Sequence, residues 1–176
     1  MELTLEATQI PDAIAGQPRS WSLPSGEVVY DQEPSHLHDN VSPELLQEAL
    51  NQVTLAPGND VQHFTIDMGR IVGQTRCVET TDADEIVYAQ RLGRGGLSRF
   101  VKGRKPEDCN TIAIKLRRDP KDDRVYLYTA FVGKPTPSEP YLANGDPTAK
   151  QFWDTHALIW GSEPTDEKTI QTQPAW

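Results

Sequence analysis

The residues of this chain that are best suited to chemistry are its histidines and a cluster of cations. His63 lies in an alternating stretch, on the opposite face from Phe64 and Ile66. A strand histidine outside the core face can reach a ligand, and an imidazole with a pKa near about 6.5 can give or take a proton at neutral pH. The alternative is a surface histidine, or one hydrogen-bonded within the fold, that has no chemical role.

The other three histidines give weaker signals. His36 and His38 form a His-x-His pair, but no Cys, His or acidic cluster with ligand spacing lies near them, so we expect no metal site. His156 lies one helical turn from both Phe152 and Trp160, which predicts a partly buried histidine on a packing face. It is kept as a reserve acid.

A basic island, defined as residues 91–106, contains several glycines and no acidic residue. Cations and backbone N–H groups in such a segment can converge on a phosphate-bearing ligand. The alternative is a solvated loop whose charges only keep the chain soluble. The island contains six cations, which are Arg91, Arg94, Arg99, Lys102, Arg104 and Lys105. We expect Arg99 to be a catalytic group and the other five to contact RNA.

Charge and composition limit the class of protein. The net charge of the 176 residues is −9, but residues 61–134 hold fourteen of the seventeen Lys and Arg. No apolar run is long enough for a membrane span, and the first twenty residues lack the basic and apolar regions of a secretory signal. Cys77 and Cys109 lack any zinc-binding spacing. Because two cysteines in a chain long enough for its own core usually stay reduced, we expect free thiols in a cytoplasmic protein without membrane contact, and a single bridge between the two is the alternative.

The hydrophobic pattern predicts an α+β fold. A helix is expected over 43–54, followed by strands at 61–66, 71–79, 85–90, 110–118 and 124–132. The link 119–123 is too short for a helical crossover, so the last two strands should form an antiparallel hairpin. A final helix is expected from Asp146 to Gly161.

These elements predict an extended N-terminal arm over 1–40, in which Leu3–Leu5 and Val28–Tyr30 are possible edge strands. A single α+β domain is expected over 41–161, with a mobile tail over 162–176. The domain should hold a twisted, mainly antiparallel sheet of four to five strands and a C-terminal helix. In the last strand we place Val125, Leu127 and Phe131 on one face, and Tyr126, Tyr128, Ala130 and Val132 on the other.

Familiar catalytic motifs are missing from the sequence. No nucleophile elbow, phosphate-binding loop, dinucleotide fingerprint, zinc-protease helix or paired-carboxylate signature occurs. The chemistry that remains open to one histidine, several cations and hydroxyl groups on a sheet is cleavage of RNA by its own 2′-OH. The substrate then supplies the nucleophile, and the protein needs only a base, an acid and cations aimed at the phosphorus. This reaction needs no metal or other cofactor.

The order of elements and the stretch VYLYTAFVG at 125–133 resemble the metal-independent RNase toxins of the barnase/EndoU/colicin/RelE superfamily. The stretches RFVKGRKP at 99–106 and QFWDTHA at 151–157 are also similar to uncharacterised bacterial and phage-associated proteins near that superfamily. The resemblance implies that His63 is the acid or base, Arg99 or Lys102 the cation at the phosphorane, and Thr129 a donor to a phosphate oxygen. The chain departs from the superfamily because it lacks a second histidine on the sheet.

The sequence therefore predicts a hydrolase-like, toxin-like endoribonuclease whose partner is RNA. The main alternative is a noncatalytic module, such as an antitoxin or phage accessory protein, that binds nucleic acid or a protein partner. A second alternative is an assembly protein whose Pro-rich arms mediate oligomer contacts. The oligomeric state is left open by the sequence.

Overall fold

The computed structural model describes residues 19–176, and these divide into two compact units. Unit 1 contains the described residues up to Val72 together with Asn110–Lys134, and unit 2 contains Gly73–Cys109 and Pro135–Trp176. The chain thus leaves unit 1, returns to it for one hairpin, and leaves it again. The expected edge strand at Leu3–Leu5 lies outside the described residues.

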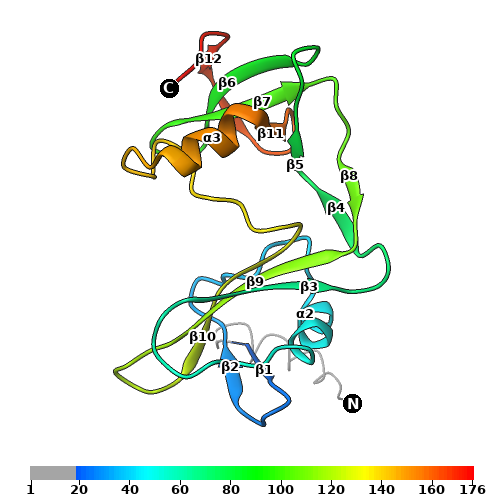
Figure 1. Cartoon of the computed structure of the whole chain (residues 1–176), viewed down its shortest axis with the longest axis vertical. Coiled ribbons are helices and arrows are strands. Elements are labelled where there is room, and N and C mark those ends of the chain that lie inside the picture. The colour runs from blue at the N-terminus through cyan, green and yellow to red at the C-terminus, as the bar shows by residue number, and fades with distance from the viewer. Residues whose placement is uncertain (1–18) are drawn as a thin grey trace, which may run out of the picture. The chain divides into compact units, whose positions relative to one another are not determined.

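Unit 1 is built on a five-stranded sheet with the order β1-β2-β10-β9-β3 (Figure 1). All neighbours are antiparallel except β2 and β10, which run parallel. The predicted hairpin of β9 and β10 is confirmed, since the two strands pair from Arg118 with Val125 to Ile112 with Val132. The strands are β1 Ser20–Ser22, β2 Val28–Tyr30, β3 Gln62–Asp67, β9 Thr111–Arg118 and β10 Val125–Val132.

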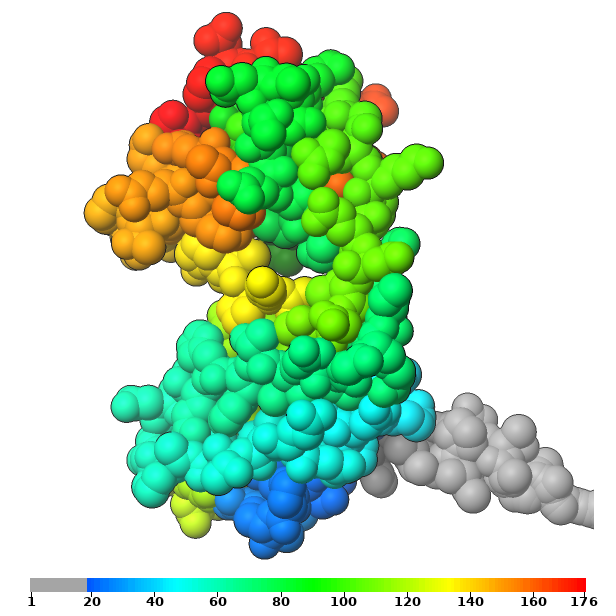
Figure 2. Space-filling model, turned by 45° about the vertical axis from the view of Figure 1, so that its right-hand side comes forward, coloured from blue at the N-terminus to red at the C-terminus, as the bar shows by residue number. Residues whose placement is uncertain are grey.

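One face of this sheet carries the core of unit 1, and helix α2 (Pro43–Leu50) contributes its apolar side. Ser42 caps the helix by accepting a hydrogen bond from the Leu45 N–H, and Pro43 fits the first turn because its missing N–H needs no partner there. Figure 2 shows α2, in cyan, directly against the N-terminal strands, in blue. The largest fully buried aliphatic side chains of unit 1 are Val29, Leu46, Leu50, Val53, Ile112, Ile114, Leu116, Val125 and Leu127.

Unit 2 has its own five-stranded sheet, with the order β12-β6-β7-β11-β5, and a two-stranded ribbon of β4 and β8. Helix α3 (Pro147–Thr155) buries Ala149 and Trp153. Phe100, Val101 and Ala157 are fully buried between the elements of this unit. The strands are β4 Gly73–Thr75, β5 Cys77–Glu79, β6 Glu85–Arg91, β7 Leu97–Lys102, β8 Glu107–Cys109, β11 His156–Ile159 and β12 Thr165–Gln171.

The fold class is α+β with mainly antiparallel sheets, as the sequence predicts, but its organisation differs from the expectation. The expected single domain over 41–161 is replaced by two units, each with a five-stranded sheet of its own. The expected mobile tail contains β12, which pairs with β6 in unit 2. In the described part of the N-terminal arm, β1 and β2 belong to the sheet of unit 1.

The end of the last helix was also placed wrongly. The helix stops at Thr155, and β11 follows at once with alternating half-buried and buried residues. Helical and strand periods both fit this short apolar run, and pairing of β11 with β5 and β7 decides in favour of the strand. No helix in residues 19–176 is long and apolar enough to cross a bilayer.

Candidate functional site

Three polar side chains form a row across β3, β9 and β10 of the unit 1 sheet. His63 on β3 is opposite Lys115 on β9, and Lys115 is opposite Thr129 on β10. Residues directly opposite each other in antiparallel strands project from the same face of the sheet. Within residues 19–176, none of these three side chains makes a hydrogen bond or an ion pair, so an imidazole, an ammonium and a hydroxyl group lie on one face with no protein partner.

The face of the sheet that carries the row is called the outer face, because the helix and the core lie on the opposite face. A β-bulge on β10 determines which residues of that strand lie on the outer face. The pairing of β10 with β9 shifts between Leu127 and Thr129, so that one extra residue, Tyr128, is inserted. Leu127 and Ala130 on either side are fully buried, whereas Tyr128 is 37% exposed and Thr129 is half-buried. The bulge thus turns both Tyr128 and Thr129 outward.

The bulge also overturns the expected faces of the last strand. Ala130 and Val132 join Val125 in the core, whereas Phe131, predicted to share the face of Leu127, lies opposite Ala113 on the outer face. Strict alternation holds only for a strand without an inserted residue, and every position after the bulge changes sides.

Aromatic rings line the outer face along β10. The ring of Tyr126 lies 6.1 Å from that of Tyr30 on β2, and the Arg124 guanidinium lies 4.8 Å from the centre of the Tyr30 ring. At the other end of the strand, the Phe131 ring lies 5.5 Å from the His38 ring. Exposed aromatic rings beside cations are the combination on which nucleic-acid bases stack.

The segment after β2 is fixed by a buried carboxylate. Asp31, which is 2% exposed, accepts hydrogen bonds from the N–H groups of Gln32 (2.8 Å) and His36 (3.0 Å) and from the hydroxyl group of Ser35. Burial opposes its ionisation, but the Ser35 and backbone hydrogen bonds and the nearby Arg19 outweigh burial, and the pKa of Asp31 lies below its ordinary value. An ionised Asp31 therefore holds this segment in place.

The same segment completes the bulge. The Gln32 side-chain amide donates to the carbonyl oxygen of Leu127 at 2.8 Å, and Nδ1 of His36 donates to the carbonyl oxygen of Tyr128 at 2.9 Å. Backbone carbonyls at a bulge lose their ladder partners and need others. Gln32 and His36 therefore serve first as partners of the β10 backbone, beside the outer face.

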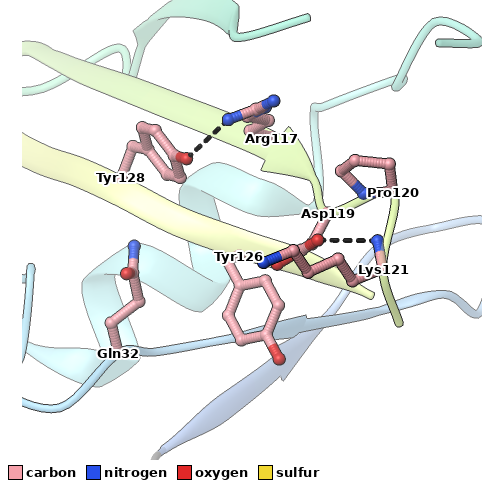
Figure 3. A pocket seen from close by; sticks show the side chains of 7 residues that line it. All are labelled: Gln32, Arg117, Asp119, Pro120, Lys121, Tyr126 and Tyr128. Atoms are coloured by element: carbon pink, nitrogen blue, oxygen red, sulfur yellow. Dashed lines mark hydrogen bonds between the residues drawn. The ribbon is translucent and has the colours of Figure 1, made fainter. Parts of the chain in front are cut away.

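A pocket of about 310 Å³ lies at the turn of the β9–β10 hairpin (Figure 3). Arg117 is held at its edge by two hydrogen bonds, from Nε to the carbonyl oxygen of Asn59 at 2.8 Å and from Nη1 to the Tyr128 hydroxyl group at 3.2 Å. The Tyr128 hydrogen bond raises the pKa of Arg117 and keeps it a fixed cation. The lining residues are Gln32, Arg117, Asp119, Pro120, Lys121, Tyr126 and Tyr128.

The predicted site residues divide between the two units. His63 and Thr129 are brought into one row in unit 1, with Lys115 between them. Arg99 and the other cations of the basic island belong to unit 2. The sequence did not reveal this row, although Lys115 and Arg117 alternate along the chain with the apolar residues Ile112, Ile114 and Leu116.

Most cations of the basic island have partners inside unit 2. Arg91, whose side chain is 14% exposed, forms ion pairs with Glu139 and Glu163. Burial lowers the pKa of Arg91, but the two carboxylates outweigh burial and raise it overall. Arg104 pairs with Asp84 at 3.1 Å.

The remaining cations of the island differ in their surroundings. Nη1 of Arg99 donates to the Thr80 hydroxyl group at 2.9 Å and to the carbonyl oxygen of His156 at 3.0 Å. Nζ of Lys102 lies 5.4 Å from the centre of the Trp160 ring. Arg94 and Lys105 are exposed and form no ion pair with any residue of 19–176.

The other candidate ligands are also engaged. The ring of His156 is stacked on Phe152 at 3.9 Å, with Nδ1 at 2.9 Å from the Phe152 carbonyl oxygen. Cys77 and Cys109 are not joined in a disulfide, and burial together with Glu139 raises the pKa of Cys77 to about 12. Within residues 19–176, no group of three or more His, Cys, Asp and Glu residues is placed to hold a metal ion.

Comparison with known proteins found no matching family model, no matching curated protein and no matching solved structure.

Proposed function

We propose that the outer face of the unit 1 sheet binds single-stranded nucleic acid, with RNA as its ligand. The observation that carries the proposal is the combination, on one face, of the free row His63, Lys115 and Thr129 with the aromatic residues of β10. Bases can stack on Tyr128, while Lys115 neutralises a phosphate. Donors and acceptors in the row suit the 2′-OH, the group that distinguishes RNA from DNA.

The charge of the chain restricts how this binding works. A net charge of −9 repels a polyanion at long range, so affinity must come from local contacts. On the neighbouring strands Lys115 lies opposite His63 and Thr129. Neither residue is a carboxylate that could neutralise the Lys115 ammonium. Two cysteines without a disulfide, of which Cys77 is inert, favour a reducing compartment, and we place this activity in the cytoplasm.

The test compares ring removal with ring retention. Tyr128→Ala should weaken binding of a single-stranded RNA by about 5–150-fold, because one stacked base contributes about 1–3 kcal/mol. Tyr128→Phe keeps the ring and should bind within about threefold of the wild type on the same stacking argument. Fluorescence anisotropy with a labelled oligouridylate measures both, and equal affinity of the two variants would exclude stacking on this ring.

The basic island provides the comparison surface. Arg94 and Lys105 are the island cations whose side chains make neither an ion pair nor a hydrogen bond within residues 19–176, so their double replacement by Gln tests an RNA contact in unit 2 without breaking either kind of contact. The proposal expects a smaller loss of affinity from this variant than from Tyr128→Ala. The opposite order would move the RNA interface to unit 2.

RNA cleavage is the second candidate function, and the row favours it because His63 lies beside an ammonium, with a hydroxyl group two strands away on the same face. Cleavage is the function that the resemblance to the metal-independent RNases implies. The obstacle is that a second proton-transfer group is missing beside His63. The histidines of the segment 36–38 lie three strand spacings, or about 14 Å, from β3, and this distance is too long for them and His63 to act on one phosphate. Noncatalytic binding is for this reason the first proposal.

The cleavage candidate has its own test. If His63 transfers a proton during 2′-OH attack, His63→Ala should lower cleavage by about 10²–10⁴-fold with little change in binding. The product should carry a 2′,3′-cyclic phosphate, EDTA should have no effect, and DNA should resist. Absence of cleavage for every RNA tested, with binding intact, would leave the binding proposal alone.

A further inference from the structure

The pocket at the β9–β10 turn is separate from the row of His63, Lys115 and Thr129, and it is lined by groups of different chemistry. It lies two residues along β9 from Lys115, or about 7 Å, at the point where the turn 119–123 ends the sheet face. Its volume of about 310 Å³ is at the lower end of the range for small-molecule sites, about 300–1000 Å³. The pocket can thus hold one small unit rather than a length of chain.

Two cations lie at this pocket. Arg117 uses Nε and Nη1 to bind Asn59 and Tyr128, which fixes the plane of the guanidinium and leaves Nη2 without a partner in residues 19–176. The ammonium of Lys121 likewise makes no ion pair within the described chain, since only its backbone N–H is engaged, with Asp119 at 2.8 Å. A doubly charged anion suits this pair better than the single charge of a phosphodiester.

The remaining lining groups have the character of a nucleoside site. Tyr126 and Tyr128 supply two aromatic rings from neighbouring positions on the outer face (Figure 3). The Tyr126 hydroxyl group donates to Asp122 at 2.6 Å, so the ring is held by its edge. The carboxylate of Asp119 and the side-chain oxygen of Gln32 are acceptors, so the ligand must bring hydrogen-bond donors as well as an anion.

We propose that this pocket binds a terminal nucleotide through its phosphate monoester. A nucleoside monophosphate carries an aromatic base for Tyr126 and Tyr128, a dianion for Arg117 and Lys121, and ribose hydroxyl groups that can donate to Asp119. The inference deepens the proposed function and rests on it, because the pocket receives the end of the strand that the outer face binds. It assigns the strand's end, rather than an internal position, to the hairpin turn.

The experiment uses the full chain and octauridylate with a phosphate at the 5′ end, at the 3′ end, or at neither end. One of the two phosphorylated strands should bind at least about fivefold more tightly than the strand without phosphate. Lys121→Gln should abolish this preference without changing affinity for the strand without phosphate, and Lys134→Gln should keep the preference. Lys134 is an exposed lysine that follows β10 in the same unit and serves as the matched control.

Failure of this inference can be distinguished from failure of the proposed function. Equal binding of all three strands, or an equal loss in the Lys121 and Lys134 variants, overturns the pocket and leaves the outer face standing. If no oligonucleotide binds, a titration with uridine 5′-monophosphate, uridine 3′-monophosphate and uridine decides. If a monophosphate binds more tightly than uridine and this preference needs Lys121, the pocket is supported and the outer face is not. If there is no such preference, both the pocket and the outer face are overturned as binding sites.

Discussion

The replacement Lys115→Gln removes the central charge of the outer face and gives the sharpest electrostatic prediction. Lys115 forms no ion pair within residues 19–176, so its loss frees no carboxylate that would disturb the fold. If Lys115 neutralises an internal phosphate while Arg117 and Lys121 together neutralise the terminal phosphate dianion of a phosphorylated oligouridylate, log K should fall against log salt with a slope of about −2.1, since each contact on a single strand contributes about 0.7. The variant should show a slope of about −1.4 on the same basis.

These slopes predict measurable differences in affinity. Between 50 and 200 mM salt the wild type should lose affinity by about 18-fold and the variant by about sevenfold. If the electrostatic contribution disappears near 1 M salt, the variant should bind about fivefold more weakly than the wild type at 0.1 M. Anisotropy titrations of labelled oligouridylate at four or more salt concentrations give both numbers.

The control is Lys168→Gln, which removes one exposed lysine without an ion pair from β12 in unit 2. It lowers the net charge by the same amount and should leave the slope unchanged. A slope that is the same in wild type and Lys115→Gln, or that falls equally in the Lys168 variant, would refute a phosphate contact at Lys115.

The remaining predictions concern the scaffold. Leu127→Ala empties a fully buried site and should cost about 2–5 kcal/mol of unfolding free energy in chemical denaturation; a loss below about 1 kcal/mol would contradict its place in the core. Arg91→Met leaves a buried Glu139 uncompensated and should destabilise unit 2 by about 3–5 kcal/mol while RNA affinity is unchanged; weakened binding in a folded variant would give Arg91 a functional role. Asp31→Asn should cost about 1.5–3 kcal/mol at pH 7, because hydrogen bonds to a charged group are lost. Since the folded pKa of Asp31 is depressed, its stabilisation is complete above the ordinary value of 3.8 and is lost as the pH falls through the lower native value. The stability difference between wild type and Asp31→Asn should therefore close in acid, and a constant difference from pH 7 to pH 2 would refute the linkage.

The β9–β10 hairpin could be predicted from the sequence because its signals are local. Ile112, Ile114 and Leu116 alternate with polar residues, and the turn that follows is too short for any connection but a hairpin. The start of the helix predicted over 43–54 is confirmed for the same reason, since Ser42 and Pro43 mark it, whereas its end was placed too late, because the helix stops at Leu50.

The bulge in β10 could not be predicted, because every residue from Val125 to Val132 suits a strand on either face. Its position depends on Gln32 and His36, which take up the carbonyl groups that the ladder loses. Those partners are more than 90 residues away along the chain, and the composition of the outer face depends on them.

The partners of the basic island were hidden for a similar reason. Arg91 pairs with Glu139 and Glu163, which lie 48 and 72 residues further along the chain. A run of cations in sequence gives no information on carboxylates brought from another segment. The pattern of charges predicted a binding loop, whereas Arg91 and Arg104 hold parts of unit 2 together.

The central claim is that RNA binds the outer face of the unit 1 sheet, and amide chemical-shift mapping tests it most directly. Single-stranded oligouridylate is titrated into the ¹⁵N-labelled full chain, and shifts are followed by residue. If RNA binds this face, the largest shift changes fall in β3, in the second half of β9 and around the Tyr128 bulge. Changes confined to residues 91–106, or no changes in unit 1 at saturating RNA, would contradict it.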